Sequence, residues 1–305
     1  MNIYLVISSS SYEMLHLFYS YTCMKPNILI SMKEYLDKYT ELLKLIKNVS
    51  PFVNKIILDS GGFSTFDIKD VKVAEIMKNK YLNFIEKYYN YTHETFEYIF
   101  AFDYIHGSIN FKLNYEWFDE QCSVNEMVVP VVHNISKDSK EVDEYSVYHP
   151  KHIAIGKCQN KTNIDLLKPV IDNIRKNSKF HFLGITTPKI LTKITVDNCD
   201  SKSWIDYSKS GKLMYSYLEN DEIKSDTVFF KKYENKSYSG TIPFDDYTKK
   251  DEILKIGKLF GKEYKDFFND NQNETLMLCS LYNYMTLQDL VNKIYTSRET
   301  HVTQN

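Results

Sequence analysis

Several short apolar runs of the sequence end in a carboxylate, a histidine or a glycine. The densest group is Asp59-Ser60-Gly61-Gly62-Phe63, where two glycines are adjacent although the whole chain of 305 residues has only nine. The other residues that end such runs are Asp103, His133, Gly156, Gly184 and Asp200. Carboxylates can act as nucleophiles or as general acids and bases, and glycines let a flat ligand approach backbone N–H donors. These residue types therefore suit chemistry on a planar substrate.

Each of these residues also has a purely structural explanation. An aspartate after a strand is commonly a turn or helix cap, His133 could satisfy structural hydrogen bonds, and Gly61-Gly62 could form a tight turn. Capping by all three aspartates would not explain why glycines occur at the same level. The combined pattern favours an active site over a set of unrelated caps.

The apolar runs predict a parallel sheet. Eight runs are predicted as strands: 3–8, 27–31, 55–60, 98–103, 127–132, 152–156, 180–185 and 195–201. Helical segments are predicted between them: 11–22, 33–48, 72–90, 111–120, 138–147, 163–177 and 188–194. Apolar strands that alternate with helices are typical of a parallel sheet buried on both faces. Eight such units predict an α/β fold, a (β/α)8 TIM barrel, with an open doubly wound sheet as the alternative.

The barrel would bring the candidate residues together, because catalytic residues of such barrels lie at the carboxyl ends of the strands. The barrel core is predicted over residues 1–205. Residues 206–275 are polar and rich in Tyr and Lys, and we interpret them as an insertion before the final helices, which are predicted at 250–268 and 274–296. Residues 276–305 are predicted to contain the C-terminal helix that completes the barrel, followed by a tail.

Composition limits the partners and the compartment. The formal net charge is −2, so a nucleic-acid site has to be a local basic patch. The five cysteines occur singly, which indicates neither a disulfide framework nor a structural zinc site. We therefore expect a cytoplasmic protein, in the host cytoplasm if it is viral, with no metal and no cofactor. The N-terminal apolar run is too short to span a membrane, and no membrane partner is expected.

Six segments together resemble one enzyme family. They are LDSGGFS (58–64), FAFD (100–103), VVPVVHN (128–134), IAIGKC (153–158), FLGITTP (182–188) and VDNCDSKSW (196–204). In this order they are similar to the motifs of the tRNA-guanine transglycosylases, whose signature is DSGGFQ, over residues 56–204. The DSGGF segment is fairly specific, and the ordered set is more specific than any later segment alone.

Within this superfamily the sequence is most similar to the DNA-guanine transglycosylases of the DpdA type, which place 7-deazaguanine bases in the DNA of bacteria and phages. The chain is shorter than a typical tRNA enzyme, it carries DSKSW at 200–204, and the zinc cluster of the tRNA enzymes is missing from 206–275. His133 stands where the tRNA enzymes have a base-reading glutamine, and Lys157 replaces the second glycine of their GGL turn. These departures favour DNA over tRNA as the substrate.

The resemblance implies a double displacement that exchanges guanine in DNA for a free base such as 7-cyano-7-deazaguanine. By motif position Asp200 is the expected nucleophile and Asp59 the expected general acid/base, with Asp197 as the alternative nucleophile. Asp103 is expected to accept hydrogen bonds from N1–H and the 2-amino group of guanine. The remaining base-binding positions are Ser60, Gly61, Gly62, Phe63, His133, Gly156 and Gly184, with Tyr104 as a second stacking residue.

Two segments, 202–215 and 229–240, interleave lysine with aromatic residues, a composition that suits phosphates and stacked bases. A solvated loop face would have the same composition. The expected DNA contacts are Lys202, Lys209, Lys212, Lys231 and Lys232. A helper protein or a second copy of the chain is a further expected partner.

Three other functions are compatible with the sequence. A tRNA-guanine transglycosylase without zinc would use the same chemistry on tRNA. A non-catalytic nucleic-acid-binding subunit would not need Asp59, Asp103 or Asp200. An unrelated barrel enzyme acting on a phosphorylated sugar would need a Gly-rich phosphate loop after the seventh and eighth strands, where the sequence has none.

Overall fold

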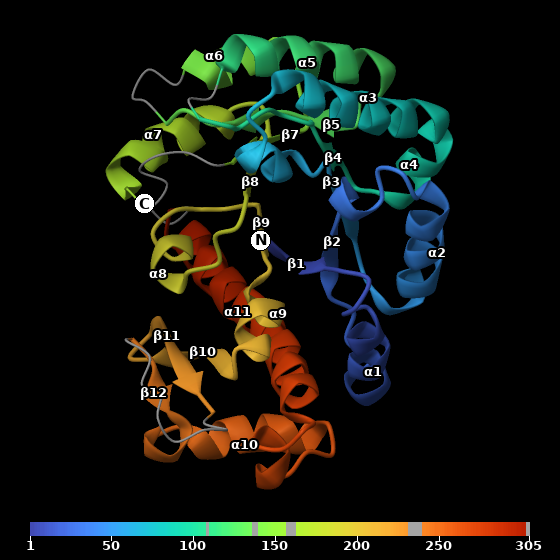
Figure 1. The fold of residues 1–305 in the computed structure, drawn as a ribbon. Coiled ribbons are helices and arrows are strands. Elements are labelled where there is room, and N and C mark those ends of the chain that lie inside the picture. The colour runs from blue at the N-terminus through green and yellow to red at the C-terminus, as the bar shows by residue number, and fades with distance from the viewer. Residues whose placement is uncertain (108–109, 136–139, 157–162, 231–239, 303–305) are drawn as a thin grey trace.

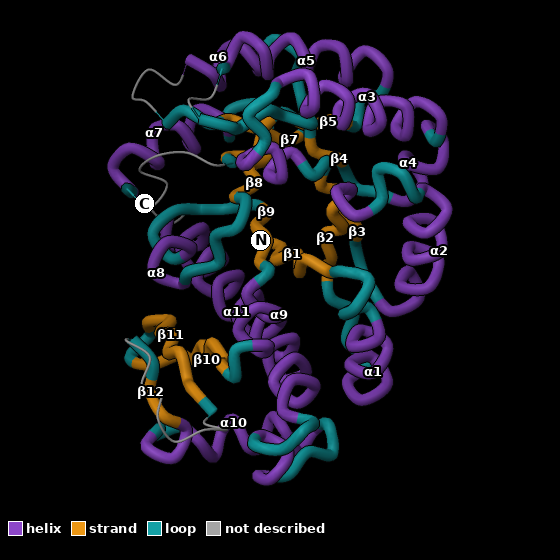
Figure 2. The backbone as a smooth tube through the Cα atoms, viewed as in Figure 1, coloured by secondary structure: helices purple, strands orange, loops and turns teal. Residues whose placement is uncertain are grey.

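A parallel sheet forms the centre of the computed structural model, which describes residues 1–302 except 108–109, 136–139, 157–162 and 231–239. Within these residues the sheet has nine strands in the order β5-β4-β3-β2-β1-β9-β8-β7-β6. Their bounds are β1 Asn2–Ile7, β2 Asn27–Ser31, β3 Ile56–Asp59, β4 Ile99–Phe100, β5 Val128–Val129, β6 Val131–Val132, β7 His152–Ile155, β8 Lys179–Phe182 and β9 Asn198–Ser201. Figure 2 shows these strands around a common centre.

The two outermost strands of this order, β5 and β6, are separated in the chain only by Pro130. Proline has no N–H to donate to a sheet, so it interrupts the strand. Its carbonyl still accepts a hydrogen bond from Ala154 N at 3.0 Å, and the carbonyl of Val129 accepts one from Ala101 N at 2.9 Å. Residues 128–132 therefore pair with β4 on one side and β7 on the other, and the sheet is a nearly closed barrel.

Helices surround this sheet (Figure 1). They are α1 Glu13–Thr22, α2 Tyr39–Val49, α3 Val71–Lys87, α4 Tyr89–Thr95, α5 Phe111–Val124, α6 Lys140–Ser146, α7 Ile164–Ile174, α8 Pro188–Leu191, α9 Ser203–Lys209 and α11 Gln272–Val302. Three short 3-10 helices join them: η1 Met32–Glu34, η2 Ser50–Phe52 and η3 Gly62–Asp67. The long helix α11 fixes the start of the chain, because Gln288 Oε1 accepts a hydrogen bond from Ile3 N at 2.7 Å.

The predicted alternation of strands and helices around a parallel sheet is confirmed. Each of the eight apolar runs overlaps a strand, although β4 is shorter than the predicted run and the run 127–132 is divided by Pro130. The predicted helix 72–90 is divided into α3 and α4, and 33–48 begins as η1 before α2. The predicted helix 188–194 ends at Leu191.

The side chains of the strands point alternately into the barrel and toward the helices, and they form two apolar cores. Inward-facing residues fill the barrel in a small cluster: Tyr4, Leu29, Ile57, Tyr98, Phe100, Val129, Val131 and Ala154. The larger cluster lies between the strands and the helices and includes Leu5, Ile28, Ile30 and Leu58. Because side chains on a strand alternate between its two faces, residues two positions apart share a face. This alternation fixes which residues point into the barrel.

The predicted insertion at 206–275 contains regular structure that the sequence reading missed. The strands β10 (Lys212–Glu219) and β11 (Glu222–Phe229) form an antiparallel hairpin, and β12 (Ile242–Pro243) pairs with β11. Asn220 and Asp221 both have positive φ, 52° and 61°, as a two-residue type I′ turn requires. The rest comprises η4 Phe244–Asp246, α10 Lys250–Leu259 and η5 Tyr264–Phe267, so the predicted helix 250–268 is interrupted.

This small unit has its own apolar core, which contains Leu213, Val228, Phe230, Phe244 and Phe267. The first turns of α11 contribute Leu276 and Cys279 to the same core. Figure 1 shows α11 running from the small unit to the barrel. The helix therefore joins the two cores.

Among the helices that the structure describes, none is long and apolar enough to span a membrane.

Candidate active site

A ring of polar residues and a glycine closes the carboxyl end of the barrel. Four of its members follow a residue of the inner cluster by two positions: Ser31 after Leu29, Asp59 after Ile57, His133 after Val131 and Gly156 after Ala154. They therefore face inward, as the inner cluster does. Asp200 joins the ring from β9, where it pairs in register with Tyr4 of that cluster. The sequence-predicted positions thus come together at one end of the sheet.

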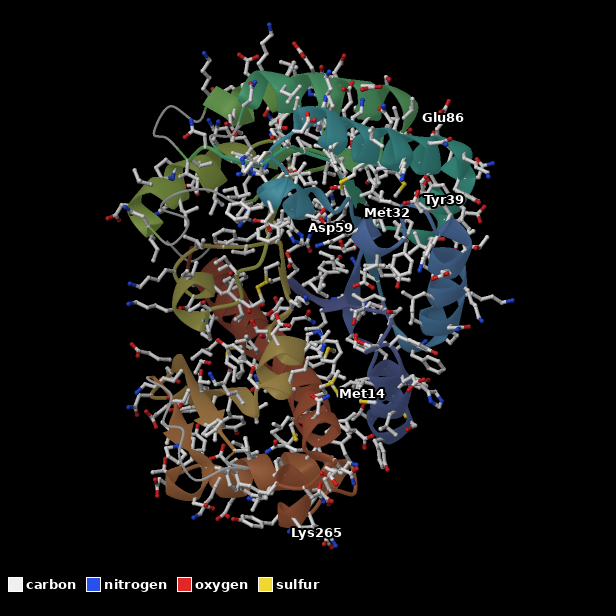
Figure 3. The ribbon with its side chains drawn as sticks, viewed as in Figure 1. Met14, Met32, Tyr39, Asp59, Glu86 and Lys265 are labelled. Carbon is white, nitrogen blue, oxygen red and sulfur yellow. The ribbon has the colours of Figure 1, made fainter. Side chains whose placement is uncertain are left out.

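Asp59 ends β3 and is only partly exposed. Figure 3 shows it beside β3, toward the centre of the ring of strands. Burial raises the pKa of its carboxyl group from 3.8 to about 6; the hydrogen bond from Ser31 opposes this shift, and the negative charges of Asp103 and Asp200 add to it. The Ser31 hydroxyl donates to Oδ2 at 2.8 Å, and Gly61 N donates to the same oxygen at 3.2 Å. A carboxyl group with this pKa can give and take a proton near neutral pH.

Asp103 and His133 form a buried pair, each 8% exposed. His133 Nε2 is hydrogen-bonded to Asp103 Oδ2. The backbone of His133 is held from α6, because its N–H and that of Asn134 donate to Oε2 of Glu141 at 2.8 and 3.1 Å. The histidine therefore orients the carboxylate from a fixed position, a relationship that the sequence reading did not predict.

Glycines make room for this pair. An added β-carbon at Gly156 would lie 2.8 Å from Cε1 of His133, and one at Gly62 would lie 1.8 Å from Oδ1 of Asp103. Real β-carbons do not approach other atoms this closely, so both positions require glycine. These two glycines therefore leave space for the side chains of the buried pair.

The glycine N–H groups that we expected to face a ligand donate within the protein. Gly61 N donates to Asp59, Gly62 N to Ser60 Oγ, Gly156 N to the carbonyl of Val132, and Gly184 N to Asp200. Ser60 is 1% exposed, and its hydroxyl donates to the carbonyl of Ala101 at 2.8 Å. In this structure Ser60 and the glycines brace the site, and the side chains of the ring supply its polar atoms.

Asp200 is held at one oxygen by two donors. His181 Nε2 and Gly184 N both lie 3.0 Å from Oδ1. No donor among the described residues contacts Oδ2. His181 is fully buried in β8, and its Nδ1 lies 2.7 Å from the hydroxyl of Tyr98. The sequence reading missed His181, although it is the one polar residue inside the run 180–185 at an inward position.

Asp197, the alternative nucleophile, lies three residues earlier and faces the helices. Its Oδ2 accepts from Phe180 N at 2.9 Å, at the start of β8, and its Oδ1 lies 3.6 Å from Arg175 Nη2. Asp197 therefore lies toward the amino ends of the strands. The structure brings Asp200, and not Asp197, to Asp59 and Asp103.

The two expected stacking residues differ in their surroundings. Phe63 lies on η3 and is 70% exposed, with its ring within 10° of parallel to that of Phe66 at a centroid distance of 6.4 Å. The hydroxyl of Tyr104 donates to the carbonyls of Ile68 and Lys69, which fixes its ring outside the ring of carboxylates. Of the two residues, Phe63 is the more exposed.

The three predicted lysines that the structure describes lie at different distances from the mouth of the barrel. Lys202 is exposed and directly follows Ser201, the last residue of β9. Lys209 lies at the other end of α9, about 10 Å further along the helix at 1.5 Å per residue. Lys212 begins β10. The predicted contacts Lys231 and Lys232 lie outside the described residues.

In the described part of the chain, no group of three or more His, Cys, Asp and Glu side chains is placed to hold a metal ion. The arrangement instead provides one carboxylate with an accessible oxygen, one carboxyl group with a raised pKa and one histidine-oriented carboxylate. These groups are suited to nucleophilic attack combined with acid/base catalysis.

The chain matches no protein-family model, and no curated protein matches it significantly.

Proposed function

We propose that this chain is a DNA-guanine transglycosylase, which exchanges guanine in DNA for a free 7-deazaguanine base through a covalent aspartyl-deoxyribose intermediate. The observation that carries the proposal is the grouping of Asp59, Asp103 and Asp200, in which Asp59 has its pKa raised to about 6 by burial, against the hydrogen bond from Ser31 and with the other two charges adding to the shift. Such a pairing of a nucleophile with an acid/base is the arrangement that retaining glycosyl transfer uses. The resemblance of the six segments to guanine transglycosylases supports the same assignment.

The proposal includes the barrel type. We infer that β5 and β6 act as one strand interrupted by Pro130, which gives eight parallel strands and a (β/α)8 barrel. Catalytic residues of this fold lie at the carboxyl ends of the strands. The ring of polar residues has this position.

The first step would cleave the N-glycosidic bond. Oδ2 of Asp200 attacks C1′ of the deoxyribose, the C1′–N9 bond breaks, and its electron pair leaves with guanine. The protonated carboxyl group of Asp59 gives its proton to the departing base. Hydrogen bonds to Oδ1 from His181 and Gly184 leave the attacking oxygen exposed to the sugar.

The second step would reverse these events with a different base. Asp59, now ionised, takes the N9 proton of the incoming 7-deazaguanine, whose N9 attacks C1′ and releases Asp200. Asp103, with Oδ2 hydrogen-bonded to His133, presents a carboxylate to the N1–H and 2-amino donors of either base. A guanine in a duplex must be extruded first, at a cost of a few kcal/mol.

The direct test is exchange of labelled guanine into tRNA, single-stranded DNA and duplex DNA supplied in equal amounts. We expect incorporation into DNA, faster when it is single-stranded because no base pair has to be broken. Incorporation into tRNA alone would show that the substrate is tRNA and not DNA. No incorporation into any of the three nucleic acids would refute the proposed function.

Matched aspartates give the control. Asp200→Asn should lower exchange by at least about a thousandfold, as expected for loss of a nucleophile. Asp197→Asn, three residues away, should leave the rate nearly unchanged. The reverse result would assign the nucleophile to Asp197.

A further inference from the structure

Below the mouth of the barrel, Asp200 continues into a chain of hydrogen bonds that the proposed reaction does not itself use. Oδ1 of Asp200 lies 3.0 Å from His181 Nε2, and His181 Nδ1 lies 2.7 Å from the Tyr98 hydroxyl. The exposed fractions of Asp200, His181 and Tyr98 are 6%, 0% and 2%. Because His181 is fully buried, its partners in the protein determine which of its nitrogens carries a proton.

The Tyr98 hydroxyl also forms a hydrogen bond with Tyr4, whose own hydroxyl donates to Glu97. With a neutral His181, the donors and acceptors between Asp200 and Tyr98 have one consistent direction. An ionised carboxylate can only accept, so His181 Nε2 must carry a proton that it donates to Asp200. A neutral imidazole then has an unprotonated Nδ1, which accepts from a hydroxyl. Burial raises the pKa of Tyr98 well above its usual value of 10, so this phenol keeps its proton and can donate it.

The aromatic neighbours of His181 favour the neutral ring, whereas the adjacent Asp200 carboxylate favours the imidazolium. Phe100 meets His181 edge to face at 4.9 Å, and Tyr4 lies at 6.0 Å, both centroid distances within the inner cluster. These aromatic neighbours offer little solvation to an imidazolium, and burial disfavours the charged form of a histidine. His152 stacks on the ring of Tyr98, and burial lowers its pKa to about 3.

We propose that Tyr98 and His181 are positioning residues that hold the Asp200 carboxylate with Oδ1 fixed and Oδ2 directed to the substrate. Asp200 places the proton of His181 on Nε2, and Tyr98, by donating to Nδ1, keeps the ring neutral. Neither residue touches the substrate. The catalytic consequence rests on the proposed function, whereas the tautomer of His181 does not depend on it.

The test is nitrogen NMR of the full chain with 15N-labelled histidine at neutral pH. The chain has eight histidines, so the His181 signals are assigned by their loss in His181→Gln. We expect one protonated nitrogen, Nε2, and one unprotonated nitrogen, Nδ1. An imidazolium signal, or the Nδ1–H tautomer, in the unsubstituted protein would overturn the proposal without any further variant.

Tyr98→Phe then removes the hydroxyl and keeps the ring. We expect the His181 signals to shift toward the imidazolium, because Nδ1 loses its hydroxyl donor while Nε2–H still faces Asp200. Tyr81→Phe is the matched control, because it removes another buried hydroxyl, which donates to the carbonyl of Phe100 at 2.7 Å and does not contact His181. His181 signals that are the same in Tyr98→Phe as in the unsubstituted protein would show that Tyr98 does not keep the ring neutral.

Activity separates this proposal from the function. If the chain exchanges guanine, Tyr98→Phe should lower kcat and leave the KM for the free base unchanged, while Tyr81→Phe changes neither. If the predicted tautomer is found but no polymer is exchanged, the hydrogen-bond chain stands and the proposed function fails. Exchange that is unaffected by Tyr98→Phe would reject the positioning role.

Discussion

Gly62 and Asp103 lie in contact, so that an added β-carbon at Gly62 would stand 1.8 Å from Oδ1 of Asp103. The turn after β3 and the end of β4 are thereby fitted to each other at the mouth of the barrel. The other oxygen of Asp103 is hydrogen-bonded to His133. The carboxylate therefore cannot move away from Gly62 without breaking that hydrogen bond. The adjacent glycines of the DSGGF segment therefore serve a steric requirement of the site.

Gly62→Ala should displace Asp103 and separate it from His133. We expect discrimination between guanine and adenine to fall together with the exchange rate, because Asp103 is the proposed reader of the guanine edge. Gly257→Ala is a matched control, since its β-carbon would clash with the ring of Phe267 at 2.7 Å in the small unit. The control should lower the unfolding temperature and leave discrimination intact; equal loss of discrimination in both would contradict this role of Gly62.

Asp59→Asn should stabilise the protein at pH 7. The folded-state pKa of Asp59, raised to about 6 by burial and its charged neighbours, exceeds its ordinary value of 3.8, so ionisation above pH 6 disfavours the folded state. The contribution of Asp59 to the free energy of unfolding should therefore rise as pH falls from 7 toward 4, and Asp59→Asn should lack this contribution. We expect a gain of about 1–3 kcal/mol at pH 7 in urea unfolding.

Exposed Asp289 on α11 provides the comparison, and Asp289→Asn should change the stability by less than about 0.5 kcal/mol. Asp59→Asn should also lose exchange activity, because it removes the proton donor. A variant less stable than the unsubstituted protein at pH 7 would contradict the raised pKa.

His152 should make the fold sensitive to acid. Both ring nitrogens are buried without a hydrogen-bond partner among the described residues, and burial lowers its pKa from 6.5 to about 3. The unfolded chain thus binds a proton between pH 6.5 and 3 that the folded chain does not, so stability is lost as pH falls through this range.

His152→Phe keeps a ring against Tyr98 and removes the proton. Between pH 7 and 4.5 the unsubstituted protein should lose roughly 2–3 kcal/mol more unfolding free energy than this variant, measured by urea titration. His16→Phe, at an exposed histidine that meets Phe52 edge to face, should leave the pH dependence unchanged. Parallel pH profiles for the unsubstituted protein and His152→Phe would refute the effect.

Two lysines at opposite ends of α9 should contribute unequally to DNA binding. Lys202 adjoins the mouth, whereas Lys209 lies about one helix length away. Lys202→Ala should weaken single-stranded DNA binding and reduce the slope of log affinity against log salt by about 1, as loss of one phosphate contact does. Lys209→Ala should leave the slope unchanged. Equal effects would place the DNA path along the whole helix.

The strands could be predicted because each is a short apolar run buried on both faces, and the candidate aspartates could be predicted because they end those runs. The pairing of His133 with Asp103 could not, since it joins residues thirty positions apart through strand order and register. His181 was missed because a histidine inside an apolar strand is compatible with a core residue. The hairpin 212–229 was missed because its Tyr and Lys content resembled that of a polar loop, and the Asn220-Asp221 turn was not recognised.

The most direct measurement of the central claim is capture of the covalent intermediate. The protein is incubated with a guanine-containing single-stranded DNA, denatured and digested, and the modified peptide is located by mass spectrometry. We predict release of guanine and a deoxyribose-linked oligonucleotide on the peptide containing Asp200, with no adduct in Asp200→Asn. An adduct on another residue, or its persistence in Asp200→Asn, or the absence of any adduct from a protein that releases guanine, would contradict the account.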